Sequence, residues 1–131
     1  MEQTSSEDLI ENRILIVDDD DIYIFSASYA INKYYPGYEI LTSRNGEDGL
    51  ERIKQFKISA LFLDLDMPLM NGWEVIEALK AKFTSPPFPI VITSATDDQG
   101  DIDKLKGDSF IKAFIGKPMT PEKLEELNLA L

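Results

Sequence analysis

Acidic residues with the potential for chemistry follow two of the most apolar segments of the chain. Asp18 and Asp19 come directly after residues 14–17, and Asp64 ends the segment 60–64, with Asp66 two positions further on. Two like charges about 4 Å apart repel by ~4 kcal/mol at an effective dielectric constant near 20. A cluster of these carboxylates therefore needs a cation, and oxygen ligands without histidine or cysteine suit a hard divalent ion such as Mg²⁺.

Polar residues also end two further apolar segments. Thr93 and Ser94 close residues 89–94, and Lys117 follows residues 113–116. A lysine ammonium is a point-charge partner for a phosphoryl group, and Mg²⁺ prefers one or two carboxylates together with water and a phosphate oxygen. If these segments end at one place, the sequence predicts a site that holds a metal ion and a phosphoryl group together.

The elements that bring these residues together are five short strands. Near-continuous apolar runs are typical of strands buried on both faces, as in parallel sheets. The expected strands are residues 13–17, 38–43, 60–64, 89–94 and 113–116.

Amphipathic segments separate these strands and predict five helices. Apolar residues at helical spacing mark four of them, and residues 98–106 form the fifth, less regular one. Asp20 and Asp21 are expected to begin the first helix, where negative charge is favourable, and Asn45, Asn71 and Thr120 are expected N-caps. The expected apolar faces are Ile22, Phe25, Tyr29 and Ala30; Gly49, Leu50 and Ile53; Val75, Ile76, Leu79 and Phe83; and Leu124, Leu127 and Leu131.

A βα unit repeated five times predicts an α/β fold with a doubly wound parallel sheet and right-handed crossovers. Ligands of such sheets bind beyond the carboxyl ends of the strands, so the carboxylates, the hydroxyl and the lysine converge there. The 131 residues fit one domain over residues 13–131, preceded by a polar N-terminal tail over residues 1–12.

The composition excludes several classes of function. The chain has no cysteine and no histidine, which removes thiolate nucleophiles, serine–histidine pairs and histidine metal sites. Its net charge of −11 argues against nucleic-acid binding. No apolar run reaches the ~20 residues of a membrane span, and the first residues do not form a secretory signal. A cytoplasmic location is therefore the default expectation.

The motifs "ILIVDDD", "LFLDLDMPLMNGWEVI", "PIVITSA" and "FIGKP" resemble the receiver domain of two-component response regulators. The resemblance covers residues 13–131, with the motifs in the order of that family. It implies the CheY-like, flavodoxin-like fold with five strands in the order 2-1-3-4-5, and a bacterial signalling protein.

The resemblance also implies roles for the acidic residues. Asp64 would be the phosphoacceptor, taking a phosphoryl group from a histidine kinase or a phosphotransfer protein. Asp18 and Asp19 would bind Mg²⁺ together with Asp64, and Asp66 would offer its backbone carbonyl to the ion.

Four further residues take roles from the same resemblance. Ser94 would be the switch hydroxyl, Ala95 would give a backbone N–H to the phosphoryl group, and Lys117 would pair with its oxygens. The Lys117–Pro118 peptide would be cis. Phe114, where the family often has tyrosine, would be the aromatic switch.

Two alternative functions stay open at the level of sequence. The "LFLDLD" segment resembles the signature of haloacid-dehalogenase-type phosphatases, which also form an aspartyl-phosphate with Mg²⁺, but Pro68 departs from that signature. A receiver-like module that binds partners without phosphorylation is the other alternative. The leading expectation is a phosphoacceptor that is not an enzyme and has no effector domain, with an unknown downstream partner and either a monomeric or a dimeric state.

Overall fold

The computed structural model describes residues 12–95 and 99–131, which form alternating strands and helices. The strands are β1 (Arg13–Val17), β2 (Glu39–Ser43), β3 (Ala60–Asp64), β4 (Ile90–Ser94) and β5 (Ala113–Gly116). The helices are α2 (Asp21–Tyr34), α3 (Gly46–Gln55), α4 (Gly72–Lys82), α5 (Gln99–Lys106) and α6 (Pro121–Leu127).

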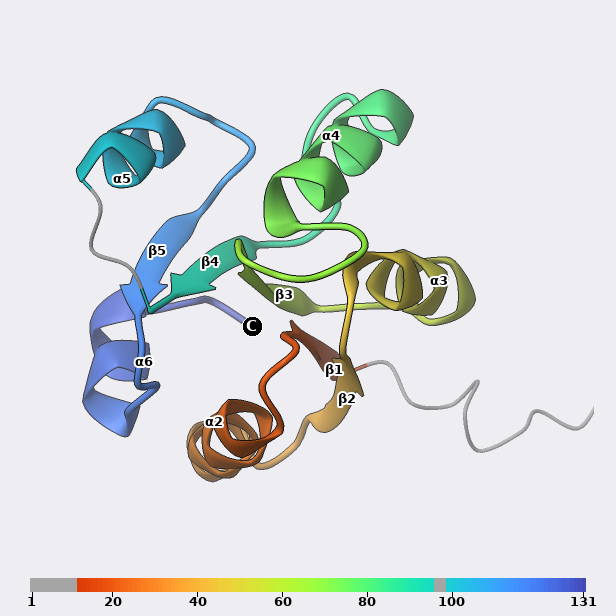
Figure 1. Cartoon of the computed structure of the whole chain (residues 1–131). Helices are drawn as coiled ribbons and strands as arrows, with labels where there is room; N and C mark the ends of the chain where they lie inside the picture. The colour runs from red at the N-terminus through yellow and green to blue at the C-terminus, as the bar shows by residue number, and fades with distance from the viewer. Residues whose placement is uncertain (1–11, 96–98) are drawn as a thin grey trace, which may run out of the picture.

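The five strands form one parallel sheet in the order β2-β1-β3-β4-β5, which confirms the expected fold and strand order (Figure 1). The registers bring the strand ends level with one another: Val17 pairs with Leu63 across β1 and β3, and Asp64 pairs with Thr93 across β3 and β4. Since all strands run in one direction, their carboxyl ends share one edge. The polar residues that follow the strands therefore meet at that edge.

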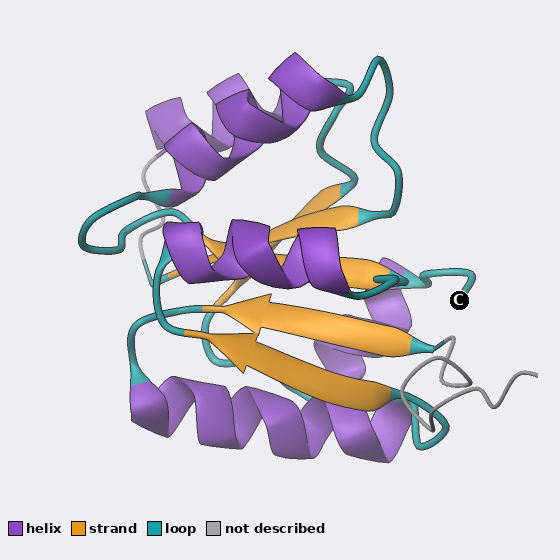
Figure 2. Ribbon diagram, turned by 90° about the vertical axis from the view of Figure 1, so that its right-hand side faces the viewer, coloured by secondary structure: helices purple, strands orange, loops and turns teal. Residues whose placement is uncertain are grey.

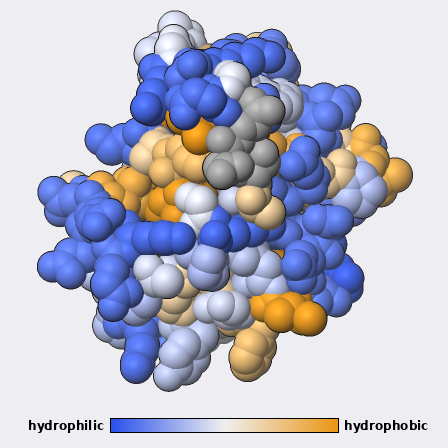
Figure 3. All heavy atoms as spheres, turned by 60° about the vertical axis from the view of Figure 1, so that its left-hand side comes forward, coloured by the Kyte–Doolittle hydropathy of each residue, from blue (hydrophilic) through white to orange (hydrophobic). Residues whose placement is uncertain are grey.

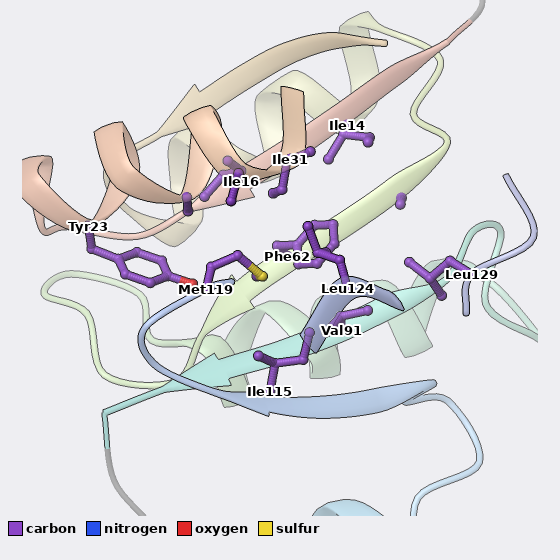
Figure 4. Close-up of a cluster of buried hydrophobic side chains, with 13 residues drawn as sticks. Ile14, Ile16, Tyr23, Ile31, Phe62, Val91, Ile115, Met119, Leu124 and Leu129 are labelled. Carbon is purple, nitrogen blue, oxygen red and sulfur yellow. The ribbon is translucent and has the colours of Figure 1, made fainter. Parts of the chain in front are cut away.

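Helices cover both faces of the sheet, as Figure 2 shows. Alternate residues of each strand point to opposite faces, so Ile14 and Ile16 pack under α2 and α6, while Leu15 and Val17 pack under the other helices. Figure 4 shows the first of these two clusters, in which side chains of β1, β3 and β4 meet those of α2 and α6. Burial on both faces explains why the strands read as continuous apolar runs.

The expected N-caps are confirmed for the helices that flank the site. Asp20 accepts hydrogen bonds from the N–H groups of the next helix, with its Oδ1 2.9 Å from the nitrogen of Ile22. Asn45 and Thr120 cap α3 and α6 in the same way, and Asn71 forms a reciprocal capping box at the start of α4. Short polar side chains thus start the helices directly after the carboxyl ends of the strands.

The predicted apolar face of the first helix was wrong. Ile22, Phe25 and Tyr29 are exposed, and the face that packs on the sheet instead contains Ala27 and Ile31. The buried stripe, Tyr23, Ala27, Ala30 and Ile31, has the same helical spacing as the predicted one, so the spacing alone does not show which stripe packs on the sheet. Of the four residues predicted for this face, Ala30 alone is buried. The other buried residues of the helix are Tyr23, Ala27 and Ile31.

The predicted end of the last helix was also wrong. The helix ends at Leu127, and Asn128 adopts a left-handed conformation that stops it. As a result Leu131 lies outside the helix and is partly exposed, while Leu129 is buried in its place. The predicted strands at residues 38–43 and 89–94 each begin one residue later in the structure. Asp98 and residues 1–11 of the predicted tail lie outside the described residues.

Hydrophilic side chains cover much of the face in Figure 3, and hydrophobic ones are gathered in separate patches. Among the described residues, no helix is long and apolar enough to cross a membrane.

Candidate phosphoryl and metal site

Three carboxylates converge at the carboxyl edge of the sheet. Oxygen atoms of Asp18, Asp19 and Asp64 lie within 4.8 Å of one another. Asp18 and Asp64 are almost completely buried, whereas Asp19 is exposed. The structure thus brings together the three side chains that the sequence analysis selected as metal ligands.

The end of β1 fixes the orientation of Asp18. Its backbone N–H continues the sheet by donating to the carbonyl of Ser43, and its Oδ1 accepts a 2.9 Å hydrogen bond from the N–H of Asp20. The other oxygen, Oδ2, is buried without a hydrogen-bond donor. Lys117 Nζ lies 2.8 Å from this oxygen as an ion pair, but not in the geometry of a hydrogen bond.

Lys117 lies opposite the carboxylates on the segment that follows β5. Its Nζ is 3.8 Å from Asp64 Oδ2, farther than from Asp18, so the lysine contacts both buried aspartates. Its backbone N–H donates to the carbonyl of Ser94, which ties this segment to the end of β4. The Lys117–Pro118 peptide is cis, as predicted.

The loop between β3 and α4 packs tightly behind Asp64. A Cβ atom on Gly72 would lie 2.3 Å from the carbonyl oxygen of Asp64, so only glycine fits there. The N–H of Gly72 donates to the carbonyl of Leu65 and closes the loop. Within the loop Asp66 is exposed, and its backbone N–H donates to the Asp64 carboxylate. Leu69 has a left-handed φ of 66° and is 80% exposed.

Burial and charge make Asp64 unusually basic. Desolvation and, after it, the charge of the neighbouring Asp18 raise the pKa of its carboxyl to about 7, although Lys117 and the N–H of Asp66 act in the opposite direction. A carboxylate with a raised pKa is a stronger nucleophile than one with an ordinary pKa. A second positive charge at the edge would restore the ionised form at neutral pH.

The arrangement fits a hard divalent cation such as Mg²⁺. Two of the three carboxylates are buried, they repel each other, and Asp18 Oδ2 has no hydrogen-bond donor. A cation bound between them supplies the missing partner and offsets the repulsion. Oxygen ligands on a partly open edge also leave room for water and a phosphoryl oxygen.

The remaining predicted site residues lie around this cluster. Ser94 is buried at the end of β4, and Ala95 is exposed directly after it. Phe114 pairs with Ile92 in the sheet, is partly buried, and packs against the cluster under α4 and α5. Ser94 and Ala95 thus lie at the carboxyl edge of the sheet, where the carboxylates also lie, whereas Phe114 lies within β5.

Sequence reasoning missed a tyrosine in the site. Tyr23 is buried, its ring lies 4.3 Å from Lys117 Nζ, and its side chain hydrogen-bonds Thr93. Burial raises its pKa. The available signal was its place three residues after the N-cap Asp20, on the face of α2 that turns toward the sheet.

A doubly wound sheet with buried carboxylates and a lysine at its carboxyl edge defines a class of phosphoryl- and metal-binding α/β domains. Residues 14–128 match the response regulator receiver domain family, and the chain belongs to it. It is therefore a response regulator component of phosphorelay signalling. Receiver domains bind Mg²⁺ in an acidic pocket and interact with histidine kinases or phosphotransfer proteins.

Curated relatives support the same family. A protein-glutamate methylesterase/protein-glutamine glutaminase of Halalkalibacterium halodurans is 34% identical over 88% of this chain, which spans 34% of that relative. Protein PilH of Pseudomonas aeruginosa is 28% identical over 86% of this chain and 90% of its own length. The chain thus spans about a third of the first relative, whose name describes an enzyme, and nearly all of the second.

Solved structures show the same fold. A two-component response regulator from Cytophaga hutchinsonii superposes with a TM-score of 0.81 at 25% identity, covering 90% of this chain and 94% of that one. The chemotaxis response regulator CheY4 of Vibrio cholerae superposes with a TM-score of 0.72 at 21% identity, covering 88% and 98%.

Proposed function

We propose that the protein accepts a phosphoryl group on Asp64 from a histidine kinase or a phosphotransfer protein, with Mg²⁺ bound by Asp18, Asp19 and Asp64. The observation that carries the proposal is the buried Asp64 carboxylate, which has oxygens of Asp18 and Asp19 within 4.8 Å and Lys117 Nζ 3.8 Å away. Phosphoryl transfer needs positioning and charge neutralisation more than any covalent device of the protein. These residues supply both.

In the proposed step an Asp64 oxygen attacks phosphorus. A P–O bond to Asp64 forms as the P–N bond to the donor histidine breaks, and the electron pair stays on the imidazole nitrogen. Asp18, Asp19, Asp64 and the backbone carbonyl of Asp66 would hold Mg²⁺, which would supply positive charge near the phosphoryl oxygens and the carboxylates. Lys117 pairs with a phosphoryl oxygen, and the N–H of Ala95 donates to one.

The phosphoryl group then acts as a switch. Ser94 turns its hydroxyl toward the new phosphoryl oxygens, and Phe114 on β5 changes its packing, which alters the surface offered to a downstream protein. We assign no enzymatic activity to this chain beyond slow loss of its own phosphoryl group. A cytoplasmic location in a bacterium is part of the same proposal.

The test uses a small phosphoryl donor, because it needs no cognate kinase. The protein is incubated with acetyl phosphate with and without Mg²⁺, and its intact mass is measured. We expect the mass of one phosphoryl group to be added only with Mg²⁺, and no addition in Asp64→Ala. Asp103→Asn, which changes an exposed carboxylate on α5, is the matched control and keeps the addition.

The same samples separate the alternatives. Steady turnover of a generic phosphomonoester would favour the phosphatase alternative. A wild-type protein that binds Mg²⁺ but gains no mass from acetyl phosphate or from a panel of histidine kinases would favour the phosphorylation-independent module. The family membership favours neither of these two outcomes.

A further inference from the structure

The Lys117 side chain needs a second support besides the carboxylates. A lysine has four rotatable side-chain bonds, and holding it in one conformation costs up to ~2 kcal/mol of entropy. Nζ lies 2.8 Å from Asp18 and 3.8 Å from Asp64, so the lysine is nearer to the carboxylate that is not the proposed phosphoacceptor. A further contact on the ammonium group would limit its movement away from Asp64.

The backbone of the lysine is held independently by another residue. Lys123, in the first turn of α6, donates to the carbonyl of Gly116 at 2.9 Å and to the carbonyl of Pro118 at 2.8 Å. These two carbonyls flank Lys117 on both sides. The backbone at Lys117 is therefore fixed, and the freedom that remains is that of the side chain.

Tyr23 contacts the end of this side chain. Its ring centroid is 4.3 Å from Lys117 Nζ, within the range of a cation–π interaction, and the residue is only 7% exposed. Figure 4 shows the tyrosine reaching from α2 toward Met119, just beyond the lysine in sequence. A buried aromatic face thus lies against the ammonium group at the edge where the carboxylates converge.

The ring itself is held at both ends. At the backbone, the N–H of Tyr23 donates to Asp20 Oδ1 at 3.2 Å, so the N-cap of α2 fixes where the side chain starts. At the tip, a side-chain hydrogen bond joins Tyr23 to Thr93, which pairs with Asp64 across β3 and β4. The ring is therefore tied to the same strand positions as the phosphoacceptor.

We propose that Tyr23 is a positioning residue for phosphoryl transfer, whose ring holds the Lys117 ammonium at the buried carboxylates Asp18 and Asp64 and whose hydrogen bond to Thr93 fixes the ring. The inference rests on the proposed function of Asp64. It adds that this chain uses an aromatic side chain from α2, together with the backbone contacts of Lys123, to place its lysine.

The rate test separates the ring from the hydroxyl. Initial rates of phosphoryl gain from acetyl phosphate are measured with saturating Mg²⁺ for wild type, Tyr23→Phe and Tyr23→Leu. We expect Tyr23→Phe to stay within threefold of wild type, because it keeps the ring, and Tyr23→Leu to fall about tenfold, the size expected of a partly desolvated cation–π contact. Tyr35→Leu, at the far end of α2, is the matched aromatic control and stays within twofold.

Repeating the substitution in the Lys117→Met variant shows whether Tyr23 acts through the lysine. In that variant, Tyr23→Leu is expected to alter the rate less than twofold. A purely structural role of Tyr23 would lower the rate equally in wild type and in Lys117→Met. Equal losses in both backgrounds, or a wild-type rate in Tyr23→Leu, would overturn the inference. If Tyr23→Leu does not fold by circular dichroism, Tyr23→Met takes its place, because the flexible methionine fills a similar volume.

A measurement without phosphoryl transfer keeps the two proposals distinguishable. Because of the ring, we expect the ε-methylene protons of Lys117 to give upfield-shifted signals in NMR spectra. These signals should be present in wild type and Tyr23→Phe and absent in Tyr23→Leu. Their loss in Lys117→Met assigns them to the lysine. Unshifted signals in wild type would overturn the inference. Failure of wild type to gain a phosphoryl group, with the shifted signals present, would overturn the proposed function and leave the ring contact established.

Discussion

Replacing Asp64 by asparagine is expected to stabilise the protein when no metal is bound. The folded pKa of Asp64 is about 7, raised first by desolvation and then by Asp18, whereas the ordinary value is 3.8. Between these values the folded state holds a proton that the unfolded state has released, so stability falls as the pH rises through this window. At ~1.4 kcal/mol per pH unit, the ionised carboxylate costs ~4 kcal/mol above pH 7.

Urea denaturation in the presence of a chelator measures this cost. We expect Asp64→Asn to be more stable than wild type by about 3 to 4 kcal/mol at pH 8 and to lose most of this advantage by pH 4, which is close to the ordinary pKa of 3.8. The exposed control Asp103→Asn should change stability by less than ~0.5 kcal/mol at either pH. An Asp64→Asn protein no more stable than wild type at pH 8 would refute the account of a buried, repelling carboxylate pair.

Three further predictions concern the residues around Asp64. Lys117→Met should bind Mg²⁺ about three- to tenfold more tightly in calorimetric titrations, because a positive charge now 2.8 Å from Asp18 is removed; weaker binding would contradict this. Gly72→Ala should lower the free energy of unfolding by ~2 to 3 kcal/mol in urea denaturation, since its Cβ would lie 2.3 Å from the Asp64 carbonyl oxygen. The control Gly107→Ala, whose Cβ would have no atom nearer than 3.8 Å, should lower it by less than ~1 kcal/mol. Leu69→Asn should raise the free energy of unfolding in urea denaturation by ~0.5 to 1 kcal/mol, because asparagine tolerates the left-handed φ of 66° that leucine adopts on the surface. A lower free energy of unfolding would show that the Leu69 side chain makes stabilising contacts in solution.

The fold was predictable because most local signals agree with it. Continuous apolar runs indicated buried parallel strands, and short polar caps such as Asn71 and Thr120 marked where helices begin. The exception is α2, where Ile22, Phe25 and Tyr29 face solvent while Ile31, Tyr23 and two alanines face the sheet. Helical spacing alone gives two possible faces there and does not decide which of them packs on the sheet.

The positions of the site residues were predictable from the strand ends, but their interactions were not. The convergence of Asp18, Asp64 and Lys117 follows from parallel topology alone. The lysine's contact with Tyr23 depends on side-chain directions from α2 and from the segment after β5, which lie about 90 residues apart in the sequence. The burial that raises the pKa of Asp64 likewise depends on how the whole edge packs, which no local pattern in the sequence encodes.

The location of the phosphoryl group in the chain shows directly whether Asp64 is the phosphoacceptor. After reaction with acetyl phosphate and Mg²⁺, borohydride reduction converts an aspartyl-phosphate to homoserine, and peptide mass spectrometry then finds the changed residue. We expect conversion at Asp64 alone, and none when Mg²⁺ is omitted. Conversion at Asp18, Asp19 or Asp66 with Asp64 unchanged would contradict this expectation.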